Sequence, residues 1–322
     1  MKKVKQRNIL IGILLIAFYL VLYFAMGNNI IPPFQQVNIY LMGINIIAAV
    51  SLNLIVGFTG QLALGHAGFM AVGAYVSAVL TMKLGQPFLV AIVAGAFVSF
   101  LLGILIGLPT LRLKGDYLAI ATLGFGEIIR GVLVNIDYVG GAAGMNGIPK
   151  LTNWTWLYVF TLITIFAIKN FLNSTHGRAC IAVRDNEIAA ETMGINTTRY
   201  KVLAFSMGAF FAGIAGALYA HYFFLIQPTT FTFNRSFDIL VMVVFGGLGS
   251  LTGSVLAAMA VTALNALLID FGGLRMIIYA LLLIIIMVFR PQGLLGTKEF
   301  TFRSLFREKE GGTASVKDKS PN

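Results

Sequence analysis

The most constraining feature of this chain is a long uncharged stretch near its start. From Asn8 to Met82 it contains no Asp, Glu, Lys or Arg. A helix that crosses a bilayer needs about 20 apolar residues, so this stretch alone is long enough for three crossings. Because the hydrocarbon interior offers no water to the backbone, such runs must form helices or closed barrels, and they are far too long for barrel strands. The sequence therefore predicts an all-α membrane protein.

The composition of the whole chain agrees with this class. Of its 322 residues, 58% are hydrophobic and only 11% are charged, whereas about 25% of the residues in a soluble domain are charged. This composition excludes a soluble fold and predicts a polytopic helical bundle of about ten spans, with broken or re-entrant helices. The predicted spans are residues 8–27, 37–57, 62–82, 87–108, 117–136, 154–171, 202–224, 237–249, 253–270 and 274–289.

The distribution of basic residues predicts the orientation of the chain. Lys and Arg mark cytoplasmic loops, and most of the 23 basic residues fall on the side of the basic N-terminus. Both termini are therefore expected in the cytoplasm. Residues 1–296 form the predicted membrane domain, and the polar residues 297–322 form a cytoplasmic tail. The N-terminal run resembles a signal peptide, but further spans follow it, so we interpret it as an uncleaved first helix. The basic residues expected outside are Lys83, Lys150, Arg235 and Arg275.

Two glycine-rich junctions interrupt the apolar runs. The short eighth segment stops at Gly246-Gly-Leu-Gly249, and a second junction lies just before Gln61. Helices interrupted in this way indicate a transport site, so Gln61, Gly246 and Gly249 are candidates for the translocation path. Close helix packing through small residues, as expected at Gly213–Gly216, is the alternative. Gln61 could present its amide to a ligand or cap a helix. Asp238 is expected to cap the eighth segment, since a carboxylate favours a helix N-terminus.

Three ionisable residues inside predicted spans complete the candidate path. Glu127 and Arg130 have the i,i+3 spacing that allows them to pair on one helix face. Charges within a membrane usually face a bundle interior or a cavity, so the pair is either a polar contact of the path or a structural ion pair. His66 lies beside Gly65 and Gly68, where its imidazole could bind a substrate or tie two helices together.

No sequence pattern predicts catalysis. The three histidines are scattered over different segments, and no phosphate-binding Gly-x-x-x-x-Gly-Lys-Ser/Thr motif occurs. We therefore expect no enzymatic activity, no catalytic or metal site and no bound cofactor. The net charge of +11 is an orientation signal, so no nucleic acid is expected as a partner. Cys180, the single cysteine, is interpreted as a passive small residue.

Charge concentrates in one long loop, residues 173–201, on the predicted cytoplasmic side. Apolar residues alternate there with seven charged ones, and this pattern predicts a short amphipathic helix. Such a helix could lie on the membrane surface or dock into a groove of a partner protein. The pattern alone leaves these two possibilities open.

Ordered motifs along nearly the whole chain resemble the membrane subunits of branched-chain amino acid ABC transporters, and in particular the longer, M-type permease. They include the run from Leu52 to Tyr75, with Gly-Phe-Thr-Gly-Gln-Leu-Ala-Leu-Gly-His at its centre, and the run from Gly115 to Arg130. The other matching stretches are residues 177–201, Ala212-Gly-Ile-Ala-Gly-Ala-Leu-Tyr219, Phe245-Gly-Gly-Leu-Gly-Ser-Leu-Thr-Gly253 and Pro291-Gln-Gly-Leu-Leu295.

The resemblance implies a multi-pass permease subunit of an ATP-driven importer in a bacterial cell membrane, surrounded by lipid. Its expected partners are a related second permease, two cytosolic ATPase subunits that use the ATP, and an extracytoplasmic binding protein. The expected cargo is a branched-chain amino acid. The alternatives are import of urea, a short amide or another small solute by the same machinery, and a stand-alone secondary transporter or channel.

The resemblance also points to an ATPase-coupling segment. In ABC importers a cytosolic loop with an Ala-Ala-x-x-x-Gly core couples to the ATPase, and Ala189, Ala190 and Gly194 reproduce that spacing. The glutamate before this core is displaced by one position, to Glu187. Arg184 and Asp185 complete the expected set, in a helix that runs from residue 184 to 194.

Overall fold

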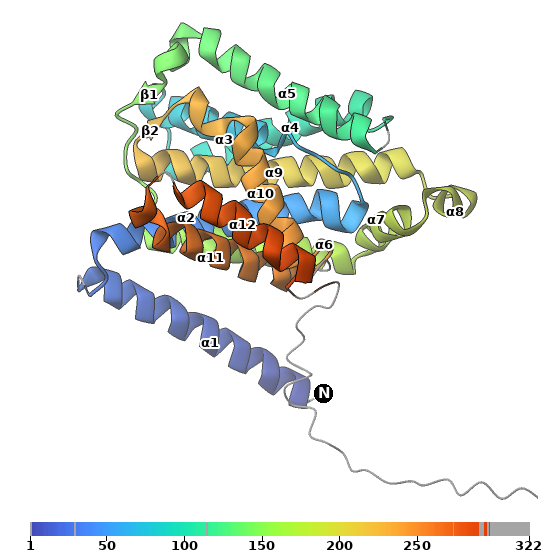
Figure 1. Ribbon diagram of the computed structural model, residues 1–322, viewed down its shortest axis with the longest axis horizontal. Coiled ribbons are helices and arrows are strands. Elements are labelled where there is room, and N and C mark those ends of the chain that lie inside the picture. The colour runs from blue at the N-terminus through green and yellow to red at the C-terminus, as the bar shows by residue number, and fades with distance from the viewer. Residues whose placement is uncertain are drawn as a thin grey trace, which may run out of the picture.

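The computed structural model describes residues 2–28, 30–113, 115–272, 274–289, 293, 294 and 296. Most of these residues form helices, and the strands among them are two paired segments of two residues each, which confirms the predicted all-α class (Figure 1). The predicted tail, residues 297–322, lies outside the described residues. The helices are α1 (Lys2–Gly27), α2 (Pro33–Thr59), α3 (His66–Met82), α4 (Phe88–Thr110), α5 (Asp116–Asn135), α6 (Trp154–Asn173), α7 (Thr175–Asp185), α8 (Glu187–Thr192), α9 (Thr197–Phe223), α10 (Phe233–Gly246), α11 (Leu251–Leu267) and α12 (Leu274–Phe289).

The long helices run between two opposite ends of the molecule (Figure 1). At one end lie α7, α8 and the N-terminus of α1, and we call this the α7–α8 end. At the other end the strands β1 (Met145–Asn146) and β2 (Leu225–Ile226) pair antiparallel, and we call this the β1–β2 end. This strand pair joins the connection after α5 to the connection after α9.

The core of the bundle is built on α2 and α9. The second half of α2 is completely buried, and α9 packs against α2, α3 and α4. Small residues allow this approach: a Cβ on Gly213 would lie 2.6 Å from the Ser99 hydroxyl, and one on Gly216 would overlap the backbone of Met70. Close packing expected at Gly213–Gly216 is therefore confirmed.

Five helices are long and apolar enough to cross a membrane, namely α2, α4, α5, α6 and α9. Among the described residues, α3, α11 and the segment Gly12–Gly27 are shorter apolar helices. Each of the ten predicted spans overlaps a helix of the structure. Five predicted starts differ from the structure by four or more residues. Two helices begin elsewhere in a way that affects the candidate residues: α3 begins at His66 instead of residue 62, and α10 begins at Phe233 instead of residue 237. The other three begin earlier than predicted, α1 at Lys2, α2 at Pro33 and α9 at Thr197.

The first helix lies at the side of the bundle (Figure 1). It contacts α6 through two tyrosines. The Tyr19 hydroxyl lies 2.9 Å from the hydroxyl of Thr155, and the Tyr158 hydroxyl donates to the carbonyl oxygen of Leu15 at 2.9 Å. Its other described side chains are largely exposed and apolar, as expected of a helix in contact with lipid.

Candidate functional site

The charged loop folds as two helices, α7 and α8, so the single helix predicted between residues 184 and 194 is wrong. The break falls at Asn186, whose backbone is extended and whose side-chain oxygen accepts a hydrogen bond from Ala189 N at 3.0 Å. Asn186 therefore ends α7 and caps the N-terminus of α8. Asn is a favoured N-cap residue because its side chain satisfies an unpaired helix N–H. Arg184 and Asp185 belong to α7, and Glu187 opens α8.

The short helix α8 has one face toward the bundle and one face away from it. Ala190 is buried, whereas Ile188 and Met193 are 74% and 82% exposed, and Ala189 is also exposed. Gly194 follows the helix with φ +82° and nothing near the position of a Cβ. The left-handed conformation explains why a glycine ends this helix. Ile188 and Met193 are therefore large apolar side chains that no described residue covers.

Two polar contacts hold α8 against α9. The Lys201 ammonium pairs with the Glu187 carboxylate at 2.5 Å, and the Thr197 hydroxyl donates to the Glu191 carboxylate at 2.7 Å. Lys201 is the more buried partner of the ion pair. These contacts give α8 a defined position relative to the bundle, although six residues alone would not form a stable helix.

Arg184 connects α7 to the bundle. Its Nη1 donates to the carbonyl oxygen of Gly57 at 3.0 Å, and its other nitrogens contact the exposed Asp185. Gly57 lies in the last turn of α2, where carbonyl groups have no partner within the helix. A Cβ on Gly249, in the turn between α10 and α11, would lie 3.0 Å from the same Nη1. The guanidinium thus lies where α7, α2 and the α10–α11 turn meet.

A pocket of about 410 Å³ opens beside this meeting point. Its wall includes the ends of α2 and α7, the start of α5, and both Lys201 and Gln61. Gln61 is 2% exposed, and neither polar atom of its side chain has a hydrogen-bond partner within the described part of the chain. It lies five residues before His66, the first residue of α3, and Gly65 occupies the N-cap position, so Gln61 does not cap that helix. A buried polar group normally has a partner, so the unsatisfied amide of Gln61 is unusual among the described residues.

The α10–α11 turn is held by Asn53, which sequence reasoning missed. Its side-chain oxygen accepts from Gly249 N at 3.0 Å, and its nitrogen donates to Ser250 O at 2.9 Å and to the Ser254 hydroxyl at 2.8 Å. Next to the turn, Gly246 packs against the backbone of Gly253. The junction thus combines an interrupted helix with close glycine packing, the two alternatives that the sequence left open.

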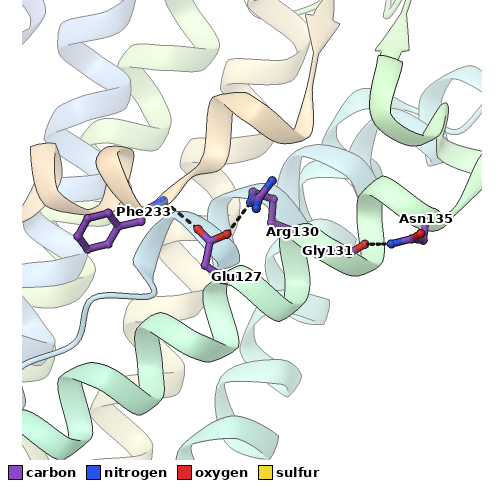
Figure 2. A network of polar contacts seen from close by, with 5 residues as sticks. All are labelled: Glu127, Arg130, Gly131, Asn135 and Phe233. Carbon is purple, nitrogen blue, oxygen red and sulfur yellow. Dashed lines mark hydrogen bonds and ion pairs between the residues drawn. The ribbon is translucent and has the colours of Figure 1, made fainter.

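Glu127 and Arg130 form an ion pair on α5, with a distance of 2.6 Å between Arg130 Nε and Glu127 Oε2 (Figure 2). The second carboxylate oxygen of Glu127 accepts from the backbone N–H of Phe233 at 3.2 Å, as Figure 2 shows. Phe233 is the first residue of α10, where N–H groups have no partner within the helix. Glu127 therefore binds the N-terminus of α10 from another helix.

His66 links two helices. Its Nε2 lies 2.9 Å from the Ser51 hydroxyl of α2, and its side chain is completely buried at the start of α3. The geometry is that of the tie between helices that the sequence allowed. No contact in the described part of the chain satisfies its Nδ1 atom.

Arg235 and Asp238 lie elsewhere than predicted. Arg235 was expected in an outer connection and Asp238 at the start of the eighth segment, but both lie inside α10, because this helix begins four residues earlier. Thr232 occupies the N-cap position instead. Arg235 Nη2 donates to the side-chain oxygen of Asn45 at 2.6 Å, and Asp238 interacts electrostatically with Arg235. Their i,i+3 spacing was the signal that could have revealed them.

Among the described residues, no group of three or more His, Cys, Asp or Glu side chains could hold a metal ion. Cys180 is buried in α7, and its thiol donates to the carbonyl oxygen of Tyr200 at 3.7 Å. Burial raises the pKa of this thiol to about 12.

Comparisons with known proteins identify the family of the chain. Residues 37–289 match the family described as "Branched-chain amino acid transport system / permease component". The chain is 37% identical over 327 residues to the high-affinity branched-chain amino acid transport system permease protein LivM of Salmonella typhimurium, covering 91% of this chain and 75% of the relative. It is 35% identical, with the same coverage, to LivM of Escherichia coli.

A second kind of permease from the same systems is more distant. LivH of Escherichia coli is 23% identical over 287 residues, covering 78% of this chain and 91% of LivH. The apolar helices and the family match together identify a multi-pass membrane protein. The chain thus belongs to the family of branched-chain amino acid transport system permease components.

Proposed function

We propose that this chain is a membrane-spanning permease subunit of an ATP-driven ABC importer for branched-chain amino acids. The observation that carries this proposal is the family match over residues 37–289, together with relatives described as permeases of such systems. The chain forms half of the translocation path. It has no cofactor of its own, because ATP is used by the partner subunits.

The α7–α8 segment is the proposed site of coupling to the ATPase. Its support is the exposed apolar pair Ile188 and Met193 beside the Ala189-Ala190 core. A helix that presents apolar side chains in this way fits a groove on a partner protein. Arg184 then passes the movement of the segment to α2 and to the α10–α11 turn, because its guanidinium lies at both.

The chain crosses the membrane about ten times, with both termini in the cytoplasm of a bacterial cell. The support is the antiparallel course of the helices (Figure 1). It is also the basic residues Arg178 and Arg184 in α7 and Arg199 and Lys201 at the start of α9. The β1–β2 end then faces outward and receives substrate from an extracytoplasmic binding protein. The second permease is a related chain, as LivM and LivH occur as separate permease proteins of one kind of system.

Substrate competition in reconstituted vesicles tests this proposal. Vesicles would hold the complete assembly of this chain, its partner permease and both ATPases, with ATP on the ATPase side and the binding protein on the other. We expect uptake of labelled leucine that unlabelled isoleucine and valine suppress and urea does not. Uptake of urea but not leucine would contradict the proposed cargo. Omission of this chain alone provides the control.

A further inference from the structure

A second pocket, of about 200 Å³, lies on the surface shared by α2, α10 and α11. It is separate from the pocket beside Arg184, with which it shares no lining residue. One wall carries the charged side chains of Arg235 and Asp238 and the amide of Asn45, and Asn265 adds a second amide. Other parts of the wall are apolar, including Leu41 and Met242. A pocket with a few convergent polar groups and an apolar remainder is the usual form of a small-molecule site.

The guanidinium of Arg235 is oriented by a chain of hydrogen bonds. The hydroxyl of Thr262 donates to the carbonyl oxygen of Ala258 at 2.7 Å and accepts from Asn45 Nδ2 at 2.8 Å. The amide oxygen of Asn45 therefore faces Arg235 and accepts its Nη2 at 2.6 Å. A guanidinium has five N–H donors, so this contact fixes one nitrogen and leaves donors for an anionic ligand.

The two charges on α10 match the two charges of an amino acid. Arg235 and Asp238 are separated by one helical turn, which places them on the same face of α10. A guanidinium binds a carboxylate through paired hydrogen bonds, and a carboxylate such as that of Asp238 binds an ammonium. Leu41 and Met242 offer an apolar surface to an aliphatic side chain.

We propose that this pocket binds the zwitterionic head group of an aliphatic amino acid during transport, with Arg235 on the carboxylate and Asp238 on the ammonium. The proposal rests on the proposed function and names the residues that recognise its cargo. Glu127 is a positioning residue of the site, since it binds the N-terminus of the helix that carries both charges. Arg235 and Asp238 interact electrostatically, and a bound zwitterion competes with this attraction, which favours weak binding suited to release.

Ligand-dependent thermal stabilisation of the complete permease–ATPase assembly tests the site directly. The assembly would be studied without binding protein, in nanodiscs of phosphatidylglycerol, which contain no zwitterionic lipid head group. A ligand that binds the folded state raises the melting temperature with its concentration. We expect L-leucine to stabilise the assembly, and leucinamide, without the carboxylate, and isocaproate, without the ammonium, to require at least about tenfold higher concentrations. Equal stabilisation by all three would overturn the proposal.

Variants assign the two charges. Arg235→Met should shift the leucine response to at least about tenfold higher concentration while leaving the leucinamide response nearly unchanged. Asp238→Asn should reduce the response to leucine and spare that to isocaproate. A purely structural role of Arg235 would instead weaken all three ligands alike. Arg112→Met, on an exposed turn between α4 and α5, is the matched control and should leave every response unchanged.

Uptake by the same unaltered assembly keeps the two proposals distinguishable. Absence of leucine uptake by the complete system would contradict the proposed function. Normal uptake together with an unchanged leucine response in Arg235→Met would contradict only this pocket. If Arg235→Met does not assemble, the comparison of leucine, leucinamide and isocaproate on the unaltered chain decides the question. In nanodiscs that contain phosphatidylethanolamine, loss of the leucine response would show that a lipid head group occupies the pocket instead.

Discussion

At the scale of single residues, the carboxylate of Glu127 joins two helices. One oxygen pairs with Arg130 and the other accepts the first N–H of α10 (Figure 2). A helix that begins within a membrane bundle needs polar partners for its free N–H groups, because lipid supplies none. The negative charge also favours the positive end of the helix dipole. Glu127 therefore stabilises the start of α10, the helix that carries Arg235.

Two double variants separate the ion pair from the contact with α10. Glu127→Gln with Arg130→Met removes the ion pair but keeps an oxygen that can accept from Phe233. Glu127→Ala with Arg130→Met removes both contacts and leaves the N–H of Phe233 without this acceptor. We expect both variants to insert into the membrane, with leucine uptake impaired in the first and more strongly in the second. Equal, unaltered uptake in both would contradict a positioning role.

Cys180 offers a test of packing at the α7–α8 end. Burial raises its pKa to about 12, so at neutral pH the thiol is protonated and unreactive, because only the thiolate is a good nucleophile. We expect N-ethylmaleimide to label Cys180 slowly at neutral pH in the native protein and rapidly after denaturation. Mass spectrometry of the labelled chain measures this. Equally rapid labelling in both states would show that α7 does not pack as described.

At the scale of elements, α8 is the short helix that meets the proposed partner, and its end depends on Gly194. The backbone of Gly194 is left-handed, a conformation that asparagine tolerates better than other side chains. Gly194→Asn should therefore keep most of the ATP-dependent uptake. Gly194→Glu adds strain of about 1 kcal/mol and a charge at the docking surface, and should abolish uptake.

The amount of each variant in the membrane must be measured beside its uptake. We expect both Gly194 variants to insert normally, because nothing lies near the position of the new Cβ. Uptake by Gly194→Glu at the level of the unaltered chain would exclude α8 from the ATPase interface. If Gly194→Asn and Gly194→Glu lose the same share of ATP-dependent uptake, backbone strain alone explains the loss.

The helices could be predicted largely from apolar runs, because a bilayer imposes length and hydrophobicity on each span. The start of α10 could not, since its first turn contains Asn234 and Arg235 and resembles a loop. Its stabilising partner, Glu127, is 106 positions away in the sequence. The break at Asn186 had a local signal, because asparagine is a frequent N-cap. The amide of Asn53 gave no signal, as its partners come from a distant turn.

At the scale of the whole molecule, three of the charged groups described above lie at different places along an apolar bundle. Arg184 lies at the α7–α8 end, Glu127 lies inside α5, and Arg235 faces the small pocket between α2, α10 and α11. The helix α10 links them. It begins beside Glu127, carries Arg235, and ends at the turn near Arg184. We propose that a movement of α7 reaches the amino-acid pocket through this helix.

The central claim is that ATP on the α7–α8 side drives leucine import through this chain. The most direct test is the initial rate of leucine uptake by vesicles that contain the complete assembly, with and without ATP inside and binding protein outside. We predict uptake against a leucine gradient only when both are present, and none when a nonhydrolysable ATP analogue replaces ATP. Leucine accumulation of equal rate without ATP or without the ATPase subunits would contradict the account.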